Sequence, residues 1–273
     1  MTRILGKRLA AMLLLVPLAA CQGVHTTQGG VVGVDRQQRM IVSNDAVVQS
    51  AQQEYAQLMS TAQNEGKLNP VAAQTNRVRS IATRLIAQTP AFRADAKSWN
   101  WEINVLKSPE VNAWCMPGGK IAVYTGMIDK LKPSDDELAA VMGHEIAHAL
   151  REHARERASE QAVAGLGIQI LSTVTGVGNV GQKGMEYAYM GLLGLPNSRS
   201  HETEADRIGV ELAARAGFDP RAAVTLWNKM GNLGDSEPPK FLSTHPSRAD
   251  RQSDLTVYSA RVLPLYEQAR ATR

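Results

Sequence analysis

The spacing of apolar residues predicts helices over much of the chain. Apolar residues recur every three or four positions in residues 44–63 and again in residues 70–88, which is the pattern of a helix with one buried face. Further helices are predicted over residues 200–216 and directly after Asp219-Pro220, where proline fits the first helical turn. We expect these segments to pack as amphipathic helices around a common core.

Two shorter stretches carry strand patterns. Residues 100–106 alternate the apolar Trp101, Ile103 and Val105 with polar neighbours, and residues 120–124 are short and β-branched after a Pro-Gly-Gly turn. A small antiparallel sheet is the expected result. The predicted fold class is therefore α+β and mainly α-helical.

The most strongly patterned helix begins at Ser134, which forms a capping box with Glu137, and is predicted to run to about Ser159. The next stretch, residues 162–196, is apolar and rich in glycine, and no piece of it convincingly spans a membrane. Two interpretations stay open for it: a mobile lid or membrane-facing hairpin, or a helix pair packed in the core. A lipid-binding or membrane-remodelling function would rest on this stretch alone.

Residues 1–20 have the pattern of a secretion signal, with three basic residues followed by an apolar run too short for a transmembrane helix. The sequence Leu18-Ala19-Ala20-Cys21 resembles the bacterial lipobox, in which the cysteine is lipidated and becomes the first mature residue. That resemblance implies a membrane anchor at Cys21. Residues 21–42 are then expected to be a flexible tether, with order starting near Ser43 and one domain over residues 43–273.

Charge and cysteine content narrow the function further. Of the 30 Lys and Arg residues, three lie in residues 1–20, so the chain from Cys21 carries 27 basic and 26 acidic residues, a net charge of +1. This balance disfavours a nucleic-acid partner. With Cys21 lipidated, Cys115 is left alone and no intramolecular disulfide is expected. By resemblance to bacterial lipoproteins, Gln22 after the cysteine implies the outer membrane, facing the periplasm.

A metal-binding pattern lies inside the helix that begins at Ser134. His144-Glu145-Ile146-Ala147-His148 is an H-E-x-x-H sequence. Two histidines four residues apart share one helix face, so both imidazoles can reach one ion, while the glutamate projects beside the open coordination position. The flanking residues are apolar, and burying two imidazoles and a carboxylate without a partner would be costly. The pattern favours zinc.

Zinc needs a third protein ligand, and the sequence leaves several candidates. They are His153, His201, Glu202, Glu204, Asp206 and His245. Glu202 and Asp206 are four apart on one predicted helix, so one can bind the ion while the other supports a ligand histidine. His153 follows His148 by five residues, about 500° of helical rotation, and is expected to point away as a solvated residue at the helix end.

Several motifs in a fixed order resemble one family. Besides the H-E-x-x-H they are Asn112-Ala113-Trp114-Cys115-Met116-Pro117-Gly118-Gly119-Lys120, Ser198-Arg199-Ser200-His201-Glu202-Thr203-Glu204-Ala205-Asp206-Arg207 and Thr244-His245-Pro246-Ser247. The chain resembles the zinc endopeptidases of the HtpX, BepA, LoiP and Oma types, which are gluzincins related to the CAAX prenyl proteases. We expect it to be similar to the compact LoiP-type lipoproteins, without the repeat-helix domain of the BepA type or the transmembrane helices of the HtpX type. The resemblance implies a zincin-like fold.

The resemblance also assigns roles to the metal-site residues. The family's E-x-x-x-D pattern implies Glu202 as third zinc ligand and Asp206 as its support, with Glu204 facing elsewhere on the helix. The family's His-Pro element implies His245 close to the metal, either as an inhibitory fourth ligand or as a donor to the reacting carbonyl. Arg251 corresponds to an arginine that stabilises negative charge.

Two further assignments from the resemblance are less specific. Arg248 is an alternative to Arg251 as the arginine that stabilises negative charge, because the spacing alone does not exclude it. Residues Asn112, Ala113, Trp114 and Cys115 resemble the family's substrate-side β element, to which a peptide adds as an extra strand. The competing interpretation is a merely structural hairpin.

The function expected from these features is zinc-dependent peptide hydrolysis with Glu145 as general base. The family implies unfolded or misassembled envelope proteins as substrates and outer-membrane assembly proteins as candidate partners. A zinc-containing chaperone or scaffold with little proteolysis is the alternative. Glu145 separates the two, because a structural zinc site needs no base beside its open position.

Overall fold

A computed structural model describes residues 23–175, 198–233, 239–245 and 250–272, and from residue 166 to residue 175 it describes the backbone alone. The helices are α2 (Asn44–Asn64), α3 (Ala72–Ile86), α4 (Thr125–Leu131), α5 (Asp135–Leu150), α6 (His153–Thr175), α8 (Arg199–Arg215), α9 (Ala222–Gly231), α10 (Lys240–Thr244) and α11 (Arg251–Ala271). Two short 3₁₀ turns cover Thr89–Ala91 and Ala94–Ser98. The strands are β1 (Gly23–Val24), β2 (Gln38–Arg39), β3 (Glu102–Leu106), β4 (Ala113–Met116) and β5 (Lys120–Tyr124).

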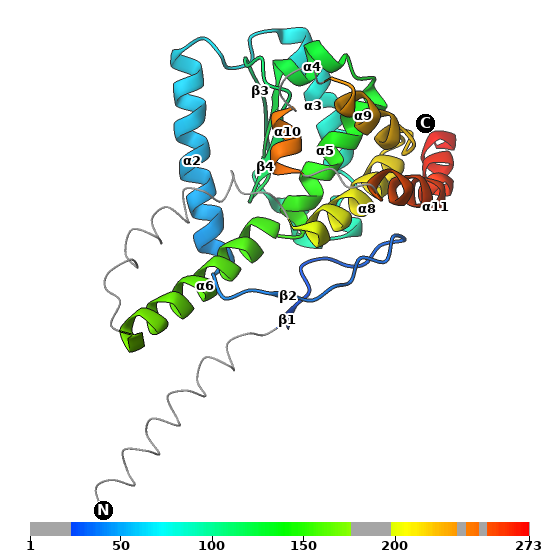
Figure 1. Cartoon of the computed structure of the whole chain (residues 1–273). Helices are drawn as coiled ribbons and strands as arrows, with labels where there is room; N and C mark the ends of the chain where they lie inside the picture. The colour runs from blue at the N-terminus through cyan, green and yellow to red at the C-terminus, as the bar shows by residue number, and fades with distance from the viewer. Residues whose placement is uncertain (1–22, 176–197, 234–238, 246–249, 273) are drawn as a thin grey trace, which may run out of the picture.

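A three-stranded sheet lies between two helical layers (Figure 1). Helix α2 packs on one face, where Tyr55 contacts the cluster around Met116. Helices α3 and α5 cover the other face. Because side chains alternate along a strand, Ile121 and Val123 enter the main core beneath α5 while Ala122 faces α2.

The sheet is mixed, which differs from the wholly antiparallel sheet expected from the sequence. Strand β4 pairs antiparallel with β5, from Ala113 opposite Val123, but β3 pairs with β5 in parallel, from Glu102 opposite Lys120. Strand β5 takes the centre because its continuous apolar run is buried on both faces, as a central strand requires. The predicted α+β, mainly helical class is confirmed.

The helix predicted from Ser134 is two helices. The capping box is present, with the Glu137 amide donating to Ser134 Oγ at 3.2 Å and the Ser134 amide donating to Glu137 Oε2 at 2.8 Å. However, α5 ends at Leu150 and α6 starts at His153, so the expected single helix to Ser159 is wrong. Glu152 breaks the helix because its backbone adopts a left-handed φ of 50°. In this conformation its carboxylate contacts Arg93 and Arg155.

Helices α5 and α8 cross at very short range. A Cβ atom added to Gly143 would lie 2.9 Å from the carbonyl oxygen of Gly209, and one added to Gly209 would lie 2.8 Å from the backbone nitrogen of His144. Only glycine allows this approach. The crossing brings the first turns of α8 against the histidines of α5.

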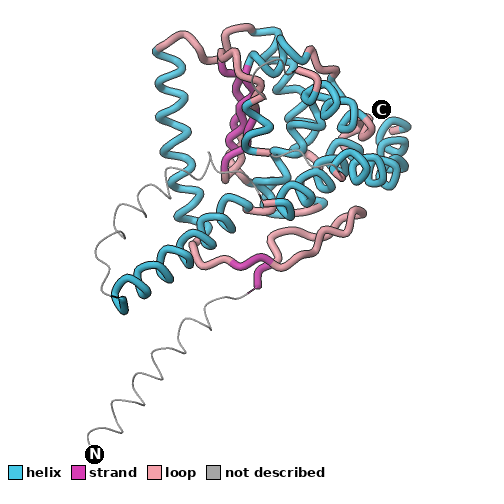
Figure 2. Tube along the Cα trace, viewed as in Figure 1, coloured by secondary structure: helices cyan, strands magenta, loops and turns pink. Residues whose placement is uncertain are grey.

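Residues 23–42 pack on the domain, where a flexible tether was expected. Val32, Val34 and Met40 are buried, and the amide of Gln28 donates to the Phe92 carbonyl at 2.8 Å. Figure 2 shows the segment as a long loop with two short strands beneath α6 and α8. These contacts follow no helix or strand period, so the spacing of apolar residues gives no sign of them.

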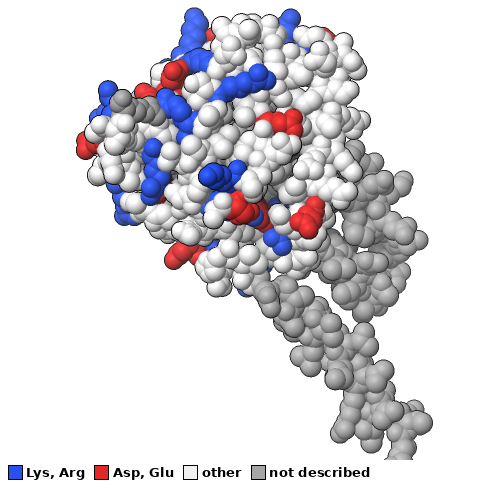
Figure 3. Space-filling model, turned by 180° about the vertical axis from the view of Figure 1, so that it is seen from behind, with Lys and Arg blue, Asp and Glu red and all other residues white. Residues whose placement is uncertain are grey.

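The expected lid or hairpin at residues 162–196 falls mostly outside the described residues. The proposed signal and Cys21 lie outside them as well. Within the described part of the chain, no helix is both long enough and apolar enough to cross a membrane. On the face drawn in Figure 3, basic and acidic side chains are interspersed and form no continuous basic surface.

Candidate metal centre

Three predicted metal ligands converge from two helices. His144 and His148 are one turn apart on α5, and their Nε2 atoms lie 3.0 Å from each other. Glu202, in the first turn of α8, places Oε1 3.3 Å from His148 Nε2 and Oε2 3.6 Å from His144 Nε2. All three side chains are buried.

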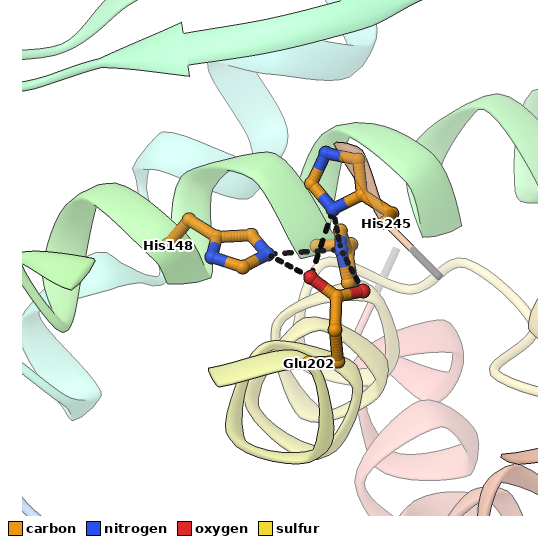
Figure 4. Close-up of side chains that lie close together, drawn as sticks. His148, Glu202 and His245 are labelled. Carbon is orange, nitrogen blue, oxygen red and sulfur yellow. Dashed lines mark hydrogen bonds and ion pairs between the residues drawn. The ribbon is translucent and has the colours of Figure 1, made fainter. Parts of the chain in front are cut away.

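His245 joins the three from the segment after α10, and Figure 4 shows its ring pointing at Glu202 and His148. Its Nδ1 lies 3.0 Å from Glu202 Oε1 and 3.1 Å from His144 Nε2. Its ring stacks on Phe241, with centroids 4.3 Å apart. Side-chain atoms of His144, His148, Glu202 and His245 thus all lie within 4.8 Å of one another.

The chemistry of this donor set fits a zinc ion. Burial lowers the pKa of His148 well below its usual range, so its ring is neutral and keeps a lone pair for a metal. Burial opposes ionisation of Glu202, but hydrogen bonds with His148 and His245 outweigh it and hold its pKa well below normal. Two imidazoles and a carboxylate are a ligand set of catalytic zinc sites.

Asp206 and Arg251 support this donor set from behind. Asp206 Oδ1 lies 2.9 Å from His144 Nδ1, which leaves His144 Nε2 to face the other ligands. Arg251 donates to Glu202 Oε2 at 2.9 Å and to Asp206 Oδ1 at 2.7 Å, and its guanidinium lies 3.4 Å from the ring centre of Trp227. The structure thus places Arg251 against two carboxylates. Its rival Arg248 lies outside the described residues.

Glu145 occupies the opposite side of the histidines. It is buried, and its Oε1 accepts no hydrogen bond but lies 3.4 Å from His245 Nε2. Burial, the largest influence, raises the pKa of Glu145. The side chain lines a pocket together with Trp114, Cys115 and His148. A buried carboxylate of raised pKa beside an open pocket is suited to accept and return a proton.

The pocket is bounded by an exposed sheet edge. Strand β4 lies at the end of the order β3-β5-β4, so no strand of the described residues pairs with the other side of its backbone. Trp114 and Cys115 are partly exposed and line the pocket, whereas Ala113 is buried. Asn112 precedes the strand, and its carbonyl accepts from the Tyr124 amide at 3.0 Å. The edge can accept an extended peptide as a further strand.

A second buried cluster lies behind His148. His153 is fully buried and places Nδ1 2.8 Å from His148 Nδ1, while its Nε2 lies 3.1 Å from Glu204 Oε2. Glu156 and His201 complete the cluster, with His201 Nε2 3.0 Å from Glu156 Oε2. The expectation that His153 is a solvated helix end is therefore wrong. Glu204 is not among the atoms that converge on the metal site and faces this second cluster instead, as expected.

Comparison with known proteins decides the family. The model of Peptidase family M48 matches residues 72–258, more than half of the chain. The chain belongs to Peptidase family M48. The predicted resemblance to the Oma and BepA types is thereby confirmed.

Several named relatives of this M48 chain are metalloendopeptidases or proteases. It is 38% identical over 176 residues to the mitochondrial metalloendopeptidase OMA1 of Arabidopsis thaliana, covering 64% of this chain and 35% of that protein. The corresponding protein of Schizosaccharomyces pombe is 37% identical over 215 residues, covering 77% and 60%. The beta-barrel assembly-enhancing protease of Escherichia coli strain K12 is 26% identical over 211 residues, covering 71% and 41%. The chain spans at most 60% of the length of these relatives.

The sequence motifs predicted the metal ligands and Glu145 better than the cluster behind His148. The structure brings the predicted ligands together with Glu145. Their grouping was predictable because each residue lies in a motif with a helical repeat or a fixed spacing. His153, Glu204 and Arg36 also lie near the site. Their positions depend on the helix break at Glu152 and on the irregular N-terminal segment, residues 23–42. A buried charge is recognisable in a sequence only when its partner is known, so the one available signal was the density of His, Glu and Arg near residue 153.

Proposed function

We propose that this M48 chain is a zinc-dependent endopeptidase. The observation that carries the proposal is the convergence of His144, His148 and Glu202 on one point, with Glu145 facing a pocket on the other side. These three residues would hold a zinc ion, which would supply a Lewis acid to polarise a peptide carbonyl and would lower the pKa of a bound water towards about 7.

Glu145 handles the proton in this proposal. It accepts a proton from the attacking water as the water oxygen bonds to the carbonyl carbon, and it returns that proton to the nitrogen as the C–N bond breaks. Its carboxylate is buried beside the pocket, and Oε1 accepts no hydrogen bond in the structure. The edge of β4, with Trp114 and Cys115, holds the substrate backbone so that its reacting carbonyl lies next to Glu145.

His245 closes the site in the arrangement described here. Its Nδ1 lies among the ligand atoms, which favours the role of inhibitory fourth ligand over that of a donor to the carbonyl. Withdrawal of the His245 ring then opens the position that water and substrate need. Arg251 acts by holding Glu202 and Asp206 in place.

We further propose that the protein is a lipoprotein of the bacterial outer membrane, anchored through Cys21, and that it cleaves unfolded or misassembled envelope proteins. The lipobox-like sequence before Cys21 and the beta-barrel assembly-enhancing proteases among the relatives support this. Expression of the chain and of Cys21→Ser in a Gram-negative host, followed by membrane fractionation, tests it. The parent is expected in the outer membrane and Cys21→Ser in the soluble periplasm. Equal distribution of the two would refute the anchor.

The metal and the activity are tested together on the full chain. The parent is expected to hold one zinc and to cleave casein, to stop after chelation, and to recover when zinc is restored. His148→Ala is expected to lose both zinc and cleavage. His25→Ala, which removes an exposed histidine from the N-terminal segment, is the matched control and keeps both. Zinc binding without cleavage by any form would favour the chaperone or scaffold function.

A further inference from the structure

The buried cluster behind His148 links this ligand to the N-terminal segment. Residues 26–42 cover the junction of α5 and α6 and send two polar side chains inward. Gln38 donates to the Arg151 carbonyl at 2.7 Å and to Glu156 Oε2 at 2.6 Å. Arg36 lies over the carboxylates of both Glu156 and Glu204.

The direction of the hydrogen bonds follows from metal binding. If His148 uses Nε2 for the metal, its Nδ1 carries the proton and donates to His153 Nδ1 at 2.8 Å. His153 must then carry its own proton on Nε2, which donates to Glu204 Oε2 at 3.1 Å. Each hydrogen bond in this series fixes the tautomer of the next histidine.

The chain of hydrogen bonds ends on two guanidinium groups. Arg151 Nε donates to Glu204 Oε2 at 2.8 Å, and Arg36 Nε donates to Glu204 Oε1. Arg36 also forms a two-pronged pair with Glu156, at 2.6 and 2.9 Å. Since Glu156 and Glu204 are both buried, removing one of these cations leaves buried carboxylates with less compensation.

We propose that the N-terminal segment is part of the metal site, with Arg36 positioning the ligand His148 through Glu204 and His153. The role of Arg36 rests on the metal site proposed above. The M48 match begins at residue 72, so this support comes from outside the matched region. The free-energy coupling between zinc binding and docking of the N-terminal segment is reciprocal. Bound zinc therefore also stabilises the docked segment.

A second metal ion at His153, Glu156 and His201 is the competing use of this cluster, since their side-chain atoms lie within 4.8 Å of one another. Two features oppose it. The rings of His153 and His201 are stacked, with centroids 4.3 Å apart and planes 19° apart, so their in-plane lone pairs do not converge easily on one ion. Arg36 already pairs with the Glu156 carboxylate.

Zinc affinity, measured by competition with a chelator on the full chain, tests the proposal. Arg36→Met and His153→Phe are each expected to bind zinc about 10- to 100-fold more weakly than the parent, the usual loss when support of a ligand is removed. The phenylalanine keeps a ring next to His201 but makes neither hydrogen bond. The control Arg39→Met removes an exposed charge from the same segment and is expected to keep the parent affinity.

The double variant and the metal-free melting temperatures separate positioning from simple destabilisation. If both residues act through one chain, Arg36→Met with His153→Phe loses little more affinity than the weaker-binding single variant. Arg36→Lys, which keeps the charge without the planar fork, should recover part of the loss. If His153→Phe does not fold, the half-exposed Arg36 still gives the test through its two substitutions.

Hydrogen exchange provides a readout independent of catalysis. Zinc is expected to slow amide exchange in residues 26–42 of the parent and to slow it less in His153→Phe. The proposal is overturned if the affinities of Arg36→Met and parent agree within about twofold, or if the metal-free Arg36→Met form melts so early that lost affinity follows from unfolding alone. Two zinc ions in the parent would also overturn it, whereas no zinc in the parent would instead refute the metal site.

Discussion

The two sides of the metal centre differ in how their polar groups are satisfied. On the pocket side, Glu145 Oε1 is buried without a hydrogen bond, and His245 reaches the site from a short helix and a loop. On the opposite side, Asp206, Glu204 and their arginines are tied together by hydrogen bonds of 2.7 to 3.1 Å. Carboxylates held by several hydrogen bonds keep a ligand still, whereas a carboxylate oxygen that accepts none is free to bind a reactant.

Removal of a pocket-side group should therefore change turnover, while removal of a group behind the ligands should change metal affinity. Three substitutions test that division, and a fourth tests whether Arg36 supports the carboxylates behind the ligands.

The largest effect is expected for Glu145→Gln, on the pocket side. Loss of the general base should reduce casein cleavage by about 10²- to 10⁴-fold, while zinc content stays at the parent level because glutamine fills the same space. Glu160→Gln, at an exposed position of α6, is the matched control with parent activity. Cleavage by Glu145→Gln at the parent rate would remove Glu145 from the mechanism.

The next effect is expected for Asp206→Asn, behind the ligands. It weakens the interaction with His144 Nδ1 and removes the charge that pairs with Arg251, so zinc affinity should fall about 10- to 100-fold. Cleavage at saturating zinc should fall much less. Chelator competition and assays at several zinc concentrations separate the two quantities, and a loss that excess zinc does not recover would contradict the assignment.

A smaller effect is expected for His245→Ala, which opens the pocket side. If the open state is populated at about 10% or less, removal of the latch should raise casein cleavage about tenfold or more. Zinc affinity should fall modestly because one donor is lost. A decrease in cleavage at full zinc occupancy would instead make His245 a donor to the reacting carbonyl.

The smallest effect is expected in acid stability. Burial opposes ionisation of Glu156, but hydrogen bonds from Arg36, His201 and Gln38 outweigh it and lower its pKa. A carboxyl whose pKa falls on folding stabilises the protein above its unfolded pKa of about 4.3, and this stabilisation is lost as the pH falls. Metal-free Arg36→Met should therefore unfold at a higher pH than the parent, by less than about one unit. Circular dichroism during acid titration measures this, and coincident curves would show that Arg36 does not hold Glu156 ionised.

The sequence predicted those parts of the fold that have a period and those parts of the site that have a spacing. Helices α2, α3 and α8 lie close to the predicted ranges, and the capping box at Ser134 is present. The H-E-x-x-H residues and Glu202 meet because a helix fixes the turn between His144 and His148, and the glycine crossing fixes α8 against α5.

The remaining features depend on contacts between distant segments. His153 was placed by continuing an ideal helix, and the left-handed Glu152 made that placement wrong. Residues 23–42 looked like a tether because their buried residues follow no repeat, yet Arg36 finds its partners 120 and 168 residues away. Such pairing has no local signal.

A zinc-bound structure of the full chain, with anomalous scattering recorded at the zinc edge, tests the central claim most directly. The predicted result is one zinc site with His144 and His148 Nε2 at about 2.0–2.1 Å and a Glu202 oxygen at about 2.0–2.2 Å, with His148 Nδ1 still bonded to His153. A peak at His153, Glu156 and His201 instead, or no peak between α5 and α8, would contradict it.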